Sequence, residues 1–385
     1  MRYQDTVLGG LLKVVSRRRF GAIVSHHDGD RYVKDFSSWD HLVTLVFAQL
    51  GGLSSLRQVE TIWNIQAAHH YHLGSGPVCR STLADANRRR PSAIFAQAFA
   101  EVTALACRTL RREGKEMLRL MDATPIPLTS LHDWADWNGR TRGLKAHVTY
   151  DPAADRPVHL EVTPATVNDV VVGRRMPIEP GATYVFDKAF VDYAWWRELD
   201  AAGCSFVTRP KTNVPLHVLK QRRLTRSDRQ ETSILSDTIV ELASQQQARL
   251  PIPLRRIVLR RDNGRFFTLL TNDLERSAGQ IAALYRKRWQ IELLFRWIKQ
   301  HLKIRTFLGR SENAVRLQIF AAMIAYLLLR IAARDSRLTL PALRLADLVR
   351  TRLFDRRPLH RIDKPSEPQQ ARHVSSPNQL SFAYV

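Results

Sequence analysis

The spacing of hydrophobic residues changes period twice along this chain of 385 residues. Up to about residue 116, apolar residues recur at helical spacing, for example over residues 39–50. Residues 117–270 instead contain short runs rich in β-branched and aromatic residues, and the helical spacing returns over residues 277–304. These changes exclude an all-helical fold and an all-β fold. We expect an α/β protein in which a mixed sheet is flanked by helices.

Two of the strand-like runs end in an acidic residue. Residues 117–122 end at Asp122, and residues 182–187 end at Asp187. A strand, a helix and another strand follow one another over residues 182–208, which predicts a crossover connection within a mixed sheet. A single acid at a strand end is commonly a turn or cap residue. Acids at the ends of two neighbouring strands can also converge on a cation.

The charge balance points to a polyanionic partner. The chain has 59 Lys and Arg residues against 36 Asp and Glu residues, a net charge of +23, which suits nucleic acid or an anionic membrane. The longest apolar run, residues 319–329, is well short of the roughly 20 residues of a spanning helix. The first thirty residues contain no secretory apolar stretch. We therefore expect no membrane partner and a cytoplasmic, nucleoid-associated protein.

The N-terminal third has arginines at the edge of a series of short helices. Helices are expected over residues 39–50 and 54–68, and another runs from Ser81 towards Arg88. A DNA-docking unit and a small helical bundle with solvated arginines both fit this pattern.

A histidine cluster lies in the same region. His69, His70 and His72 have no second cluster at ligand spacing, so a half-exposed helix end is favoured over a zinc site. The three cysteines lie far apart and fit neither a disulfide framework nor a zinc pattern. We expect free thiols.

The helix expected after the last strand carries one acid within a column of cations. At about 100° per residue, Tyr285, Arg288, Glu292 and Lys299 fall on one side, while the other side is apolar and suited to packing on a sheet. Pairing at i,i+4 on a solvated face would explain Arg288 and Glu292. The excess of cations and the flat side chains of Tyr285 and Trp289 favour a contact with nucleic acid.

The three acids predict a metal site for phosphoryl transfer. Asp122, Asp187 and Glu292 offer oxygen ligands, and Mg²⁺ typically takes one or two carboxylates together with phosphate oxygens. Two such ions about 3.5 to 4 Å apart stabilise the attacking and leaving oxygens of an in-line displacement. The surrounding cations would then hold the nucleic-acid backbone.

The sequence resembles a known family in three blocks. The Y-x2-R-x3-E-x6-K pattern that begins at Tyr285 resembles the "YREK" signature of DDE-type insertion-sequence transposases, in the group named after insertion sequence four. The D-x-A-x3-Y pattern from Asp187 and the M-D-A-T block around Asp122 resemble the blocks of the first two acids in that family. Residues 206–211 look like the basic strand end that follows. The resemblance covers about residues 16–335.

The N-terminal part shares this resemblance. Residues 47–50, 54–57 and 80–87 are similar to a helical domain that precedes the catalytic part in a subset of the group. One departure is Pro125 with Pro127, where the family more often has hydroxyl residues. This departure concerns only the local backbone after the first acid.

The resemblance implies a ribonuclease-H-like catalytic core with a β-rich insertion between the second and third acids. It also implies an endonuclease that uses two Mg²⁺ ions, with Mn²⁺ able to substitute, to free a 3′-hydroxyl at the element's ends. That hydroxyl then attacks target DNA, which completes DNA transposition. The implied partners are double-stranded DNA, both terminal inverted repeats and target, and a second protomer in a homodimeric synaptic complex.

On this basis the chain is divided into five parts. They are an N-terminal helical, DNA-binding domain (1–110), the first part of the catalytic core (111–212), the β-rich insertion (213–280), the second part of the core (281–335) and a basic, loosely ordered C-terminal tail (336–385).

The resemblance also assigns roles to individual residues. Asp122, Asp187 and Glu292 would be the catalytic residues and ligate both metal ions. Six further side chains would contact DNA: Tyr285, Arg288, Trp289, Lys299, Arg209 and Lys211.

Within this set, Arg288 and Lys299 would bind phosphates flanking the scissile bond, and Tyr285 would position the same backbone. Some family members form a hairpin at the element end, for which aromatic side chains must hold a flipped base. Trp289 and Tyr285 are the candidates, although core packing would also explain Trp289.

Two other functions use parts of the same pattern. A metal-dependent nuclease that cuts without strand transfer would use the same three acids. A DNA-binding protein descended from a transposase would not need all three acids intact.

Overall fold

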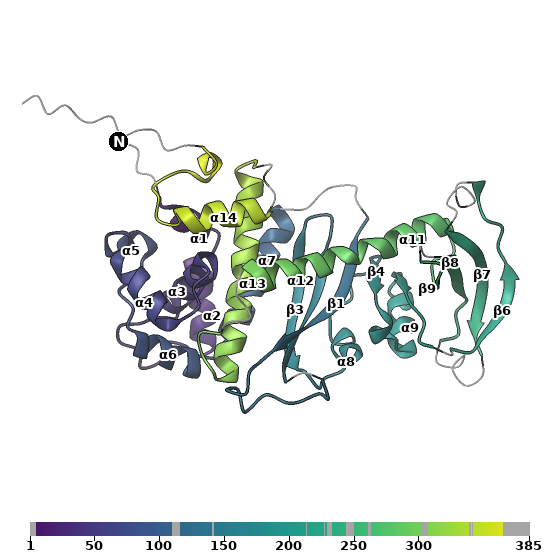
Figure 1. Ribbon diagram of the computed structural model, residues 1–385, viewed down its shortest axis with the longest axis horizontal. Helices are drawn as coiled ribbons and strands as arrows, with labels where there is room; N and C mark the ends of the chain where they lie inside the picture. The colour runs from purple at the N-terminus through teal and green to yellow at the C-terminus, as the bar shows by residue number, and fades with distance from the viewer. Residues whose placement is uncertain are drawn as a thin grey trace, which may run out of the picture.

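The computed structural model describes residues 5–109, 116–140, 142–212, 214–226, 228, 233–243, 250–260, 263–301, 307–338, 340 and 342–364. In Figure 1 the molecule is elongated, with a cluster of helices at one end and a twisted sheet that extends towards the other. The helices of the C-terminal half connect these two ends.

Within the described residues, nine strands form one sheet in the order β3-β2-β1-β4-β5-β9-β8-β7-β6. Their bounds are β1 (Leu118–Pro127), β2 (Gly143–Asp151), β3 (Arg156–Pro164), β4 (Thr183–Phe186), β5 (Ser205–Thr208), β6 (Leu216–Gln221), β7 (Ile234–Leu242), β8 (Leu254–Arg260) and β9 (Phe266–Thr271). β1, β2 and β3 form an antiparallel meander, whereas β4 and β5 run parallel to β1. The predicted mixed sheet is confirmed.

The strands of the predicted β-rich insertion extend this same sheet. β9 pairs antiparallel with β5, with Val207 opposite Thr271, and β8, β7 and β6 follow outward. Because β4 pairs with only one edge of β5, the other edge of β5 can accept a further strand.

Helices cover both faces of the sheet and form the N-terminal end. They are α1 (Val7–Leu12), α2 (Arg17–His26), α3 (Ser38–Gly51), α4 (Leu56–Ile65), α5 (Ala67–Leu73), α6 (Arg80–Arg89), α7 (Ser92–Thr109), α8 (Asp169–Gly173), α9 (Tyr193–Ala201), α11 (Ala278–Lys287), α12 (Trp289–His301), α13 (Glu312–Asp335) and α14 (Ala342–Arg352). Short 3₁₀ helices are η1 (Lys188–Phe190) and η3 (Leu359–Arg361). The Ser311 side chain caps α13 by accepting a hydrogen bond from the Ala314 N–H.

An apolar core lies on each face of the sheet. Val185 and Val207 belong to the core formed with α11, α12 and α13, whereas Phe186 and Phe206 belong to the core formed with α8 and α9. This alternation follows from the two-residue repeat of a strand. It decides which side each acid faces, because both acids directly follow residues of the second core.

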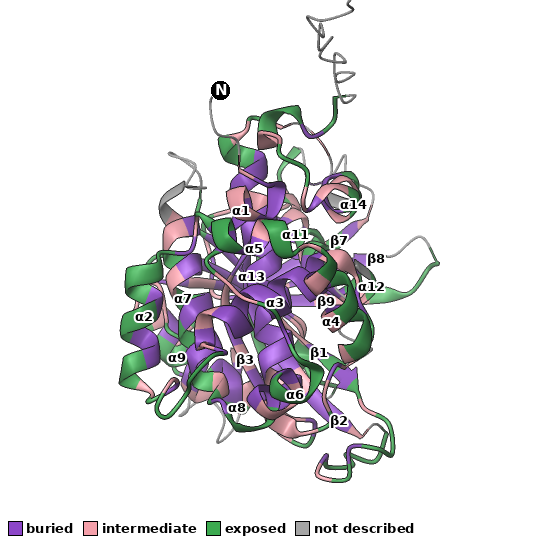
Figure 2. Ribbon diagram, turned by 90° about the vertical axis from the view of Figure 1, so that its left-hand side faces the viewer, coloured by how far each residue is buried: buried purple, intermediate pink, exposed green. Residues whose placement is uncertain are grey.

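α13 is the central helix of the molecule and is buried along most of its length, as Figure 2 shows. It is long and apolar enough to cross a membrane, and its most apolar window has a mean hydropathy of 1.7, but 89% of that window is buried inside the protein. A core helix has the same properties. The helix is also longer than the apolar run, residues 319–329, on which the sequence-based expectation rested.

The structure corrects the prediction of one helix over residues 277–304. α11 and α12 are separate helices that meet at Arg288, where the backbone stays right-handed helical. The Arg288 N–H donates to the Tyr285 carbonyl at 3.1 Å, three residues back, so one turn is tightened. The two helices still run end to end in Figure 1. Residues 302–304 lie outside the described part of the chain.

The position of Asp122 in its strand also differs from the prediction. β1 does not end at Asp122 but continues to Pro127, still paired with β2. β4 pairs with β1 only as far as Met121, so the later part of β1 has one free edge. Prolines at 125 and 127 are tolerated there because an edge strand has backbone N–H groups that need no partner strand.

The expected loosely ordered C-terminal tail is wrong for residues 342–364. α14 packs on α3, and Val349 and Ile362 are fully buried. The chain then reaches α1, where Val7 and Leu8 donate backbone hydrogen bonds to Asp355 and Leu353. The buried residues Leu345, Ala346, Val349 and Leu353 recur at helical spacing, which was a sequence signal for this helix. Residues 365–385 lie outside the described part.

Candidate active site

The parallel pairing of β1 with β4 places two of the acids side by side. Met121 and Phe186 are the last register partners of this ladder, so Asp122 and Asp187, which directly follow them, lie side by side where the two strands cease to pair. Adjacent strands lie about 4.8 Å apart. Because Met121 and Phe186 point into the core under α8 and α9, the two acids turn to the opposite face, where α11 and α12 lie.

α12 brings the third acid to the same place. This helix packs on β1, and its apolar side, including Ile291 and Ile298, is buried as predicted. Glu292 lies on the opposite side of α12. Arg288 joins the two elements: its Nη1 donates to Asp122 Oδ2 at 2.9 Å, and its Nη2 donates to Glu292 Oε1 at 2.6 Å. A single guanidinium therefore connects the first and third acids.

Asp187 is held by two other side chains. The Tyr285 hydroxyl donates to Asp187 Oδ1 at 3.4 Å, and Arg209 Nη1 lies 3.5 Å from the same oxygen. Burial, and next the negative charge of Asp187, raise the pKa of Tyr285 to about 12. The hydroxyl therefore keeps its proton at neutral pH and acts as a donor to the carboxylate.

The electrostatics of Asp122 show that the three acids share one site. Burial raises the pKa of Asp122 to about 6, and the ion pair with Arg288 opposes this shift. The negative charges of Glu292 and Asp187 also contribute to the raised pKa of Asp122. A carboxyl group in such a setting gains from the approach of a cation.

Lys299 reaches the same edge of the sheet through a contact with β1. Its ammonium group donates to the hydroxyl of Thr124, two residues beyond Asp122 on β1. Lys211 lies three residues after the end of β5, and its ammonium group donates to the carbonyl of Val191 at 3.5 Å. Both lysines therefore flank the acids.

Trp289 is 51% exposed, so the alternative that it packs in the core is wrong. Its ring lies 5.6 Å below the guanidinium of Arg296. The Tyr285 ring, by contrast, is mostly buried and contacts Phe267 with a centroid distance of 5.3 Å. A cavity of about 590 Å³ is lined by Phe267, Tyr285, Arg288 and Trp289, and of these Tyr285 and Arg288 contact the acids.

Sequence reasoning missed Phe267 and gave Thr124 no role of its own. Phe267 comes from β9, and the Arg209 guanidinium lies over its ring at 5.2 Å, so it supports two of the side chains that hold Asp187. No sequence signal marked its contact with Arg209. Thr124 belongs to the M-D-A-T block around Asp122, but its contact with Lys299 spans 175 positions and could not be predicted.

The donor set fits a divalent ion, although the present side-chain positions do not form a cage. Within the described residues, no group of three His, Cys, Asp or Glu side chains is arranged to hold a metal ion. The reason is visible in the contacts: Arg288 lies between Asp122 and Glu292. Its Nε is buried without a hydrogen-bond partner, so this position is not fully satisfied. The three carboxylates are partly exposed and supply only oxygen ligands, which suits Mg²⁺.

The other histidine and cysteine groups are structural. His70 is buried, stacks on Trp63 at 4.6 Å and bonds the Trp63 carbonyl at 2.9 Å. It thus holds the end of α5, as predicted. The three cysteines are free.

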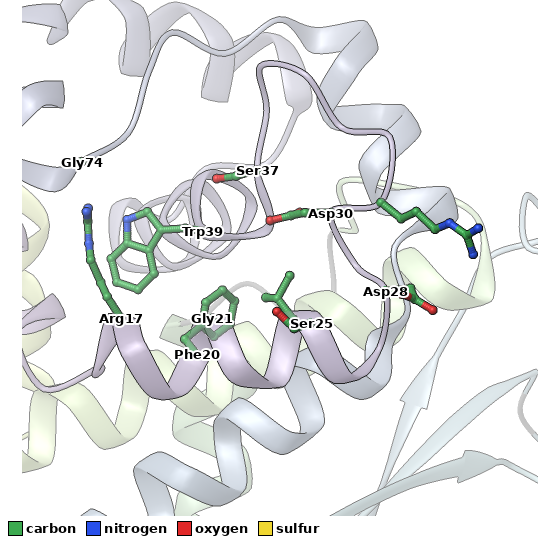
Figure 3. A pocket seen from close by; sticks show the side chains of 11 residues that line it. Arg17, Phe20, Gly21, Ser25, Asp28, Asp30, Ser37, Trp39 and Gly74 are labelled. Atoms are coloured by element: carbon green, nitrogen blue, oxygen red, sulfur yellow. The ribbon is translucent and has the colours of Figure 1, made fainter.

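A larger cavity, about 790 Å³, lies in the N-terminal helices and contains none of the three acids. Figure 3 shows Arg17 beside the indole of Trp39, and the guanidinium lies 4.7 Å from the ring centroid. Arg17 and the Trp39 indole N–H both donate to the carbonyl of Leu73. These contacts tie α2 and α3 to the end of α5, so we assign the lining a packing role.

Comparisons with known proteins agree with this geometry. The family model described as "Transposase DDE domain" matches residues 113–328, more than half of the chain, and a model described as a domain of unknown function (DUF4372) matches residues 3–75. A Sinorhizobium fredii protein described as transposase y4zB is 55% identical over 305 residues, which cover 79% of this chain and 86% of the relative.

A Geobacillus stearothermophilus protein described as a transposase for insertion sequence element IS5377 is 32% identical over 253 residues, covering 65% of this chain and 66% of the relative. The solved structure of a piggyBac transposase synaptic complex with hairpin DNA has a TM-score of 0.51 at 10% identity. It covers 100% of this chain and 87% of that chain. The mixed sheet flanked by helices and this likeness of fold fit a ribonuclease-H-like core. The chain belongs to the DDE transposases, enzymes that bind and cleave DNA and normally use divalent metal ions.

Proposed function

We propose that this protein is the transposase of an insertion sequence in the group named after insertion sequence four. It binds the terminal inverted repeats of its element, cleaves DNA at the element ends and joins the 3′-hydroxyl ends to target DNA. The observation that carries this proposal is the meeting of Asp122, Asp187 and Glu292 at one edge of the sheet, with Arg288 and Tyr285 of the YREK pattern in direct contact with them.

Each residue of the site has a proposed task. Asp122, Asp187 and Glu292 hold two Mg²⁺ ions, for which Mn²⁺ can substitute. Bound there, the ions supply an activated water or hydroxyl and stabilise charge on the leaving oxygen. Arg288 and Lys299 then bind phosphates on either side of the scissile bond.

The basic residues of β5 extend this phosphate track. Arg209 and Lys211 lie at the strand end next to Asp187, where they would hold the DNA backbone beyond the cut. Tyr285 keeps Asp187 oriented and positions the same backbone through its hydroxyl.

The cavity lined by Tyr285, Arg288 and Trp289 supports a role for Trp289 in a hairpin route. Its exposed indole borders about 590 Å³ of space together with Phe267 and Tyr285. Stacking of a base on an aromatic ring is favourable by about 1 to 3 kcal/mol. An unpaired base of the element end would therefore be held within reach of the cutting site.

Two features of the proposal concern the cell. Two element ends must be cut in concert, so the protein forms a homodimer in the synaptic complex. The protein has no membrane partner. The protein acts in the cytoplasm on the nucleoid, where its DNA is.

One assay separates this function from its two rivals. The full chain is incubated with a duplex carrying the inverted repeats that flank its gene, a target plasmid and Mg²⁺. A joined product supports the transposase, cleavage without joining indicates a nuclease, and a bound complex without cleavage indicates a DNA-binding protein only. Either of the last two results contradicts the proposal.

Lys299→Ala should weaken binding to DNA and reduce its salt dependence. A phosphate contact contributes about 0.9 to the slope of log K against log of salt concentration, so the slope should fall by about that amount. Filter binding or fluorescence anisotropy at several salt concentrations measures it. Lys220→Ala, an exposed lysine on β6, serves as the control and should leave the slope unchanged. Equal slopes in all three proteins would remove Lys299 from the interface.

Metal binding should weaken as the pH falls through 6. The pKa of Asp122 is raised to about 6, so its carboxyl group is protonated below that pH and must lose the proton to bind a cation. Affinity for Mn²⁺, measured by titration calorimetry without DNA, should be constant above about pH 7 and fall about tenfold per pH unit below 6. An affinity that is flat from pH 5 to 8 would exclude Asp122 as a ligand.

A further inference from the structure

Two helices at the N-terminal end of the molecule have the geometry of a helix-turn-helix. α3 and α4 are inclined by 100° to each other and are joined by residues 52–55. Gly52 ends α3 in the left-handed conformation, at φ 66°, and the Ser55 side chain caps α4 by accepting from the Gln58 N–H. Helices at about 90–120° joined by a short turn containing glycine form the helix-turn-helix of DNA-binding proteins.

The inner side of α4 is fixed to its neighbours. Val59 and Trp63 are fully buried, and the Trp63 ring lies 5.1 Å from that of Phe47 on α3. The Trp63 indole donates to the Gly76 carbonyl at 2.8 Å. Asn64 bonds the backbone of Val78 in both directions, at 2.8 and 2.9 Å. α4 is therefore a rigid element whose other side faces outward.

The outer side of α4 presents a stripe of exposed residues. Arg57, Thr61 and Ile65 follow one another at intervals of four residues, so they lie on one face of the helix. All three are exposed, Ile65 by 74%, and Ile62 beside them by 39%. Among the residues that the structure describes, neither Arg57 nor Thr61 uses its side chain in a hydrogen bond or ion pair.

The charge around α4 suits a polyanion. Residues 56–90 contain five arginines against two acids. Asp85 already pairs with two neighbouring arginines of α6, and Glu60 accepts the backbone N–H of Arg80 at 2.8 Å. Next to the stripe, the arginines whose side chains have no partner in the described part of the chain are therefore Arg57 on α4 and Arg80 at the start of α6, which is also exposed.

We propose that α4 is a recognition helix that enters the major groove of double-stranded DNA and reads the sequence of the element end. A helix fits the major groove, where arginine pairs with the N7 and O6 acceptors of guanine. Arg57 would make that contact at the N-terminal end of α4, and Thr61 and Ile65 would contact the following bases, including a thymine methyl group. Arg80 would bind a flanking phosphate.

The position of α4 agrees with this use. It lies at the end of the molecule opposite to β6–β9, and its exposed side is visible in the view of Figure 2. The inference rests on the proposed function, because it names the surface that selects the DNA which the acids cut.

A selection experiment tests the inference directly. The full chain is incubated with a randomised double-stranded DNA library without divalent ions, and bound duplexes are sequenced over several rounds. The wild type should enrich one motif. Arg57→Ala should lose the preference for one guanine, with the ratio of affinities for motif and scrambled duplexes reduced on the order of 10- to 100-fold. Thr61→Ala should weaken the base preference at an adjacent position of the DNA motif.

Arg18→Ala is the matched control. It removes one exposed arginine of α2 that has no partner among the described residues, and it should leave the motif and the affinity ratio unchanged. Thermal unfolding of all variants should match the wild type, because the replaced side chains are exposed and unpaired. This comparison excludes misfolding as the cause of a lost motif.

Three results would overturn the inference. In the first, Arg57→Ala and Thr61→Ala retain the full motif and the full ratio of affinities. In the second, Ile65→Ser changes the oligomeric state without changing the motif, which would assign this face to a second copy of the chain. After either result, cleavage of motif-bearing DNA by the wild type would leave the proposed function standing. A wild type that enriches no motif would contradict both proposals.

Discussion

Replacing Glu292 with alanine should reduce cleavage of element-end DNA by roughly 10³-fold or more, while binding of the same DNA is retained. The carboxylate lies beside Asp122, joined to it through Arg288, and a metal ligand in this position stabilises charge in the transition state by several kcal/mol. Asp187→Ala should have the same effect. Single-turnover cleavage of an end-labelled duplex measures the rate, and a gel-shift titration measures the affinity.

The control for this pair is Glu198→Ala, which removes an exposed acid of α9 outside the site and should leave cleavage unchanged. Persistent cleavage by either Glu292→Ala or Asp187→Ala would mean that the metal assignment is wrong. A loss of cleavage together with a loss of DNA binding would instead place these acids in the binding surface.

Arg288→Ala should have two opposite effects on metal binding and on cleavage. The guanidinium now lies between Asp122 and Glu292 at 2.9 and 2.6 Å, where it competes with a divalent ion for both carboxylates. Hydrogen bonds to charged groups contribute about 1.5 to 3 kcal/mol each, so removing them should tighten Mn²⁺ binding on the order of tenfold. Cleavage should fall, because a phosphate contact is lost.

Titration calorimetry without DNA measures the first effect, and single-turnover cleavage measures the second. Arg296→Ala is the matched control, since it removes a cation of the same helix that lies over Trp289 rather than between the acids. It should leave Mn²⁺ affinity unchanged. Weaker Mn²⁺ binding by Arg288→Ala would show that the guanidinium helps to build the site rather than to occupy it.

The parts of the fold that could be predicted are those set by local patterns. The strand run before Asp187 was recognised from its β-branched and aromatic residues, and the run before Asp122 was recognised as a short apolar segment that ends in an acid. The side of α12 that faces the sheet was predicted from the helical rotation of about 100° per residue, which places its apolar residues on one side. These signals lie within ten to twenty residues of one another, so no tertiary information was needed.

The parts that could not be predicted depend on contacts between distant segments. Pairing of β5 with β9 joins the predicted insertion to the main sheet, and no feature of either strand specifies its partner. The backbone hydrogen bonds from Val7 and Leu8 to Asp355 and Leu353 join segments more than 340 positions apart along the chain. The contact of Lys299 with Thr124 has the same origin.

The candidate site was predicted more fully than the fold around it. The spacing of Tyr285, Arg288 and Glu292 in the sequence indicated one face of a helix. In the structure, Tyr285 contacts Asp187, Arg288 contacts Asp122, and Glu292 is joined to Asp122 through Arg288. What the sequence could not give is that Arg288 lies between two of the carboxylates. This depends on the tightened turn between α11 and α12, which no proline or glycine marks.

The most direct test is a structure of the full chain with its element-end duplex and Mn²⁺, recorded with anomalous scattering at the manganese edge. We expect manganese peaks bounded by Asp122, Asp187 and Glu292, next to the phosphate at the cut position, with Arg288 moved from the carboxylates to the DNA. Manganese bound away from any one of these acids, or Arg288 still bridging Asp122 and Glu292 beside a bound ion, would contradict the account.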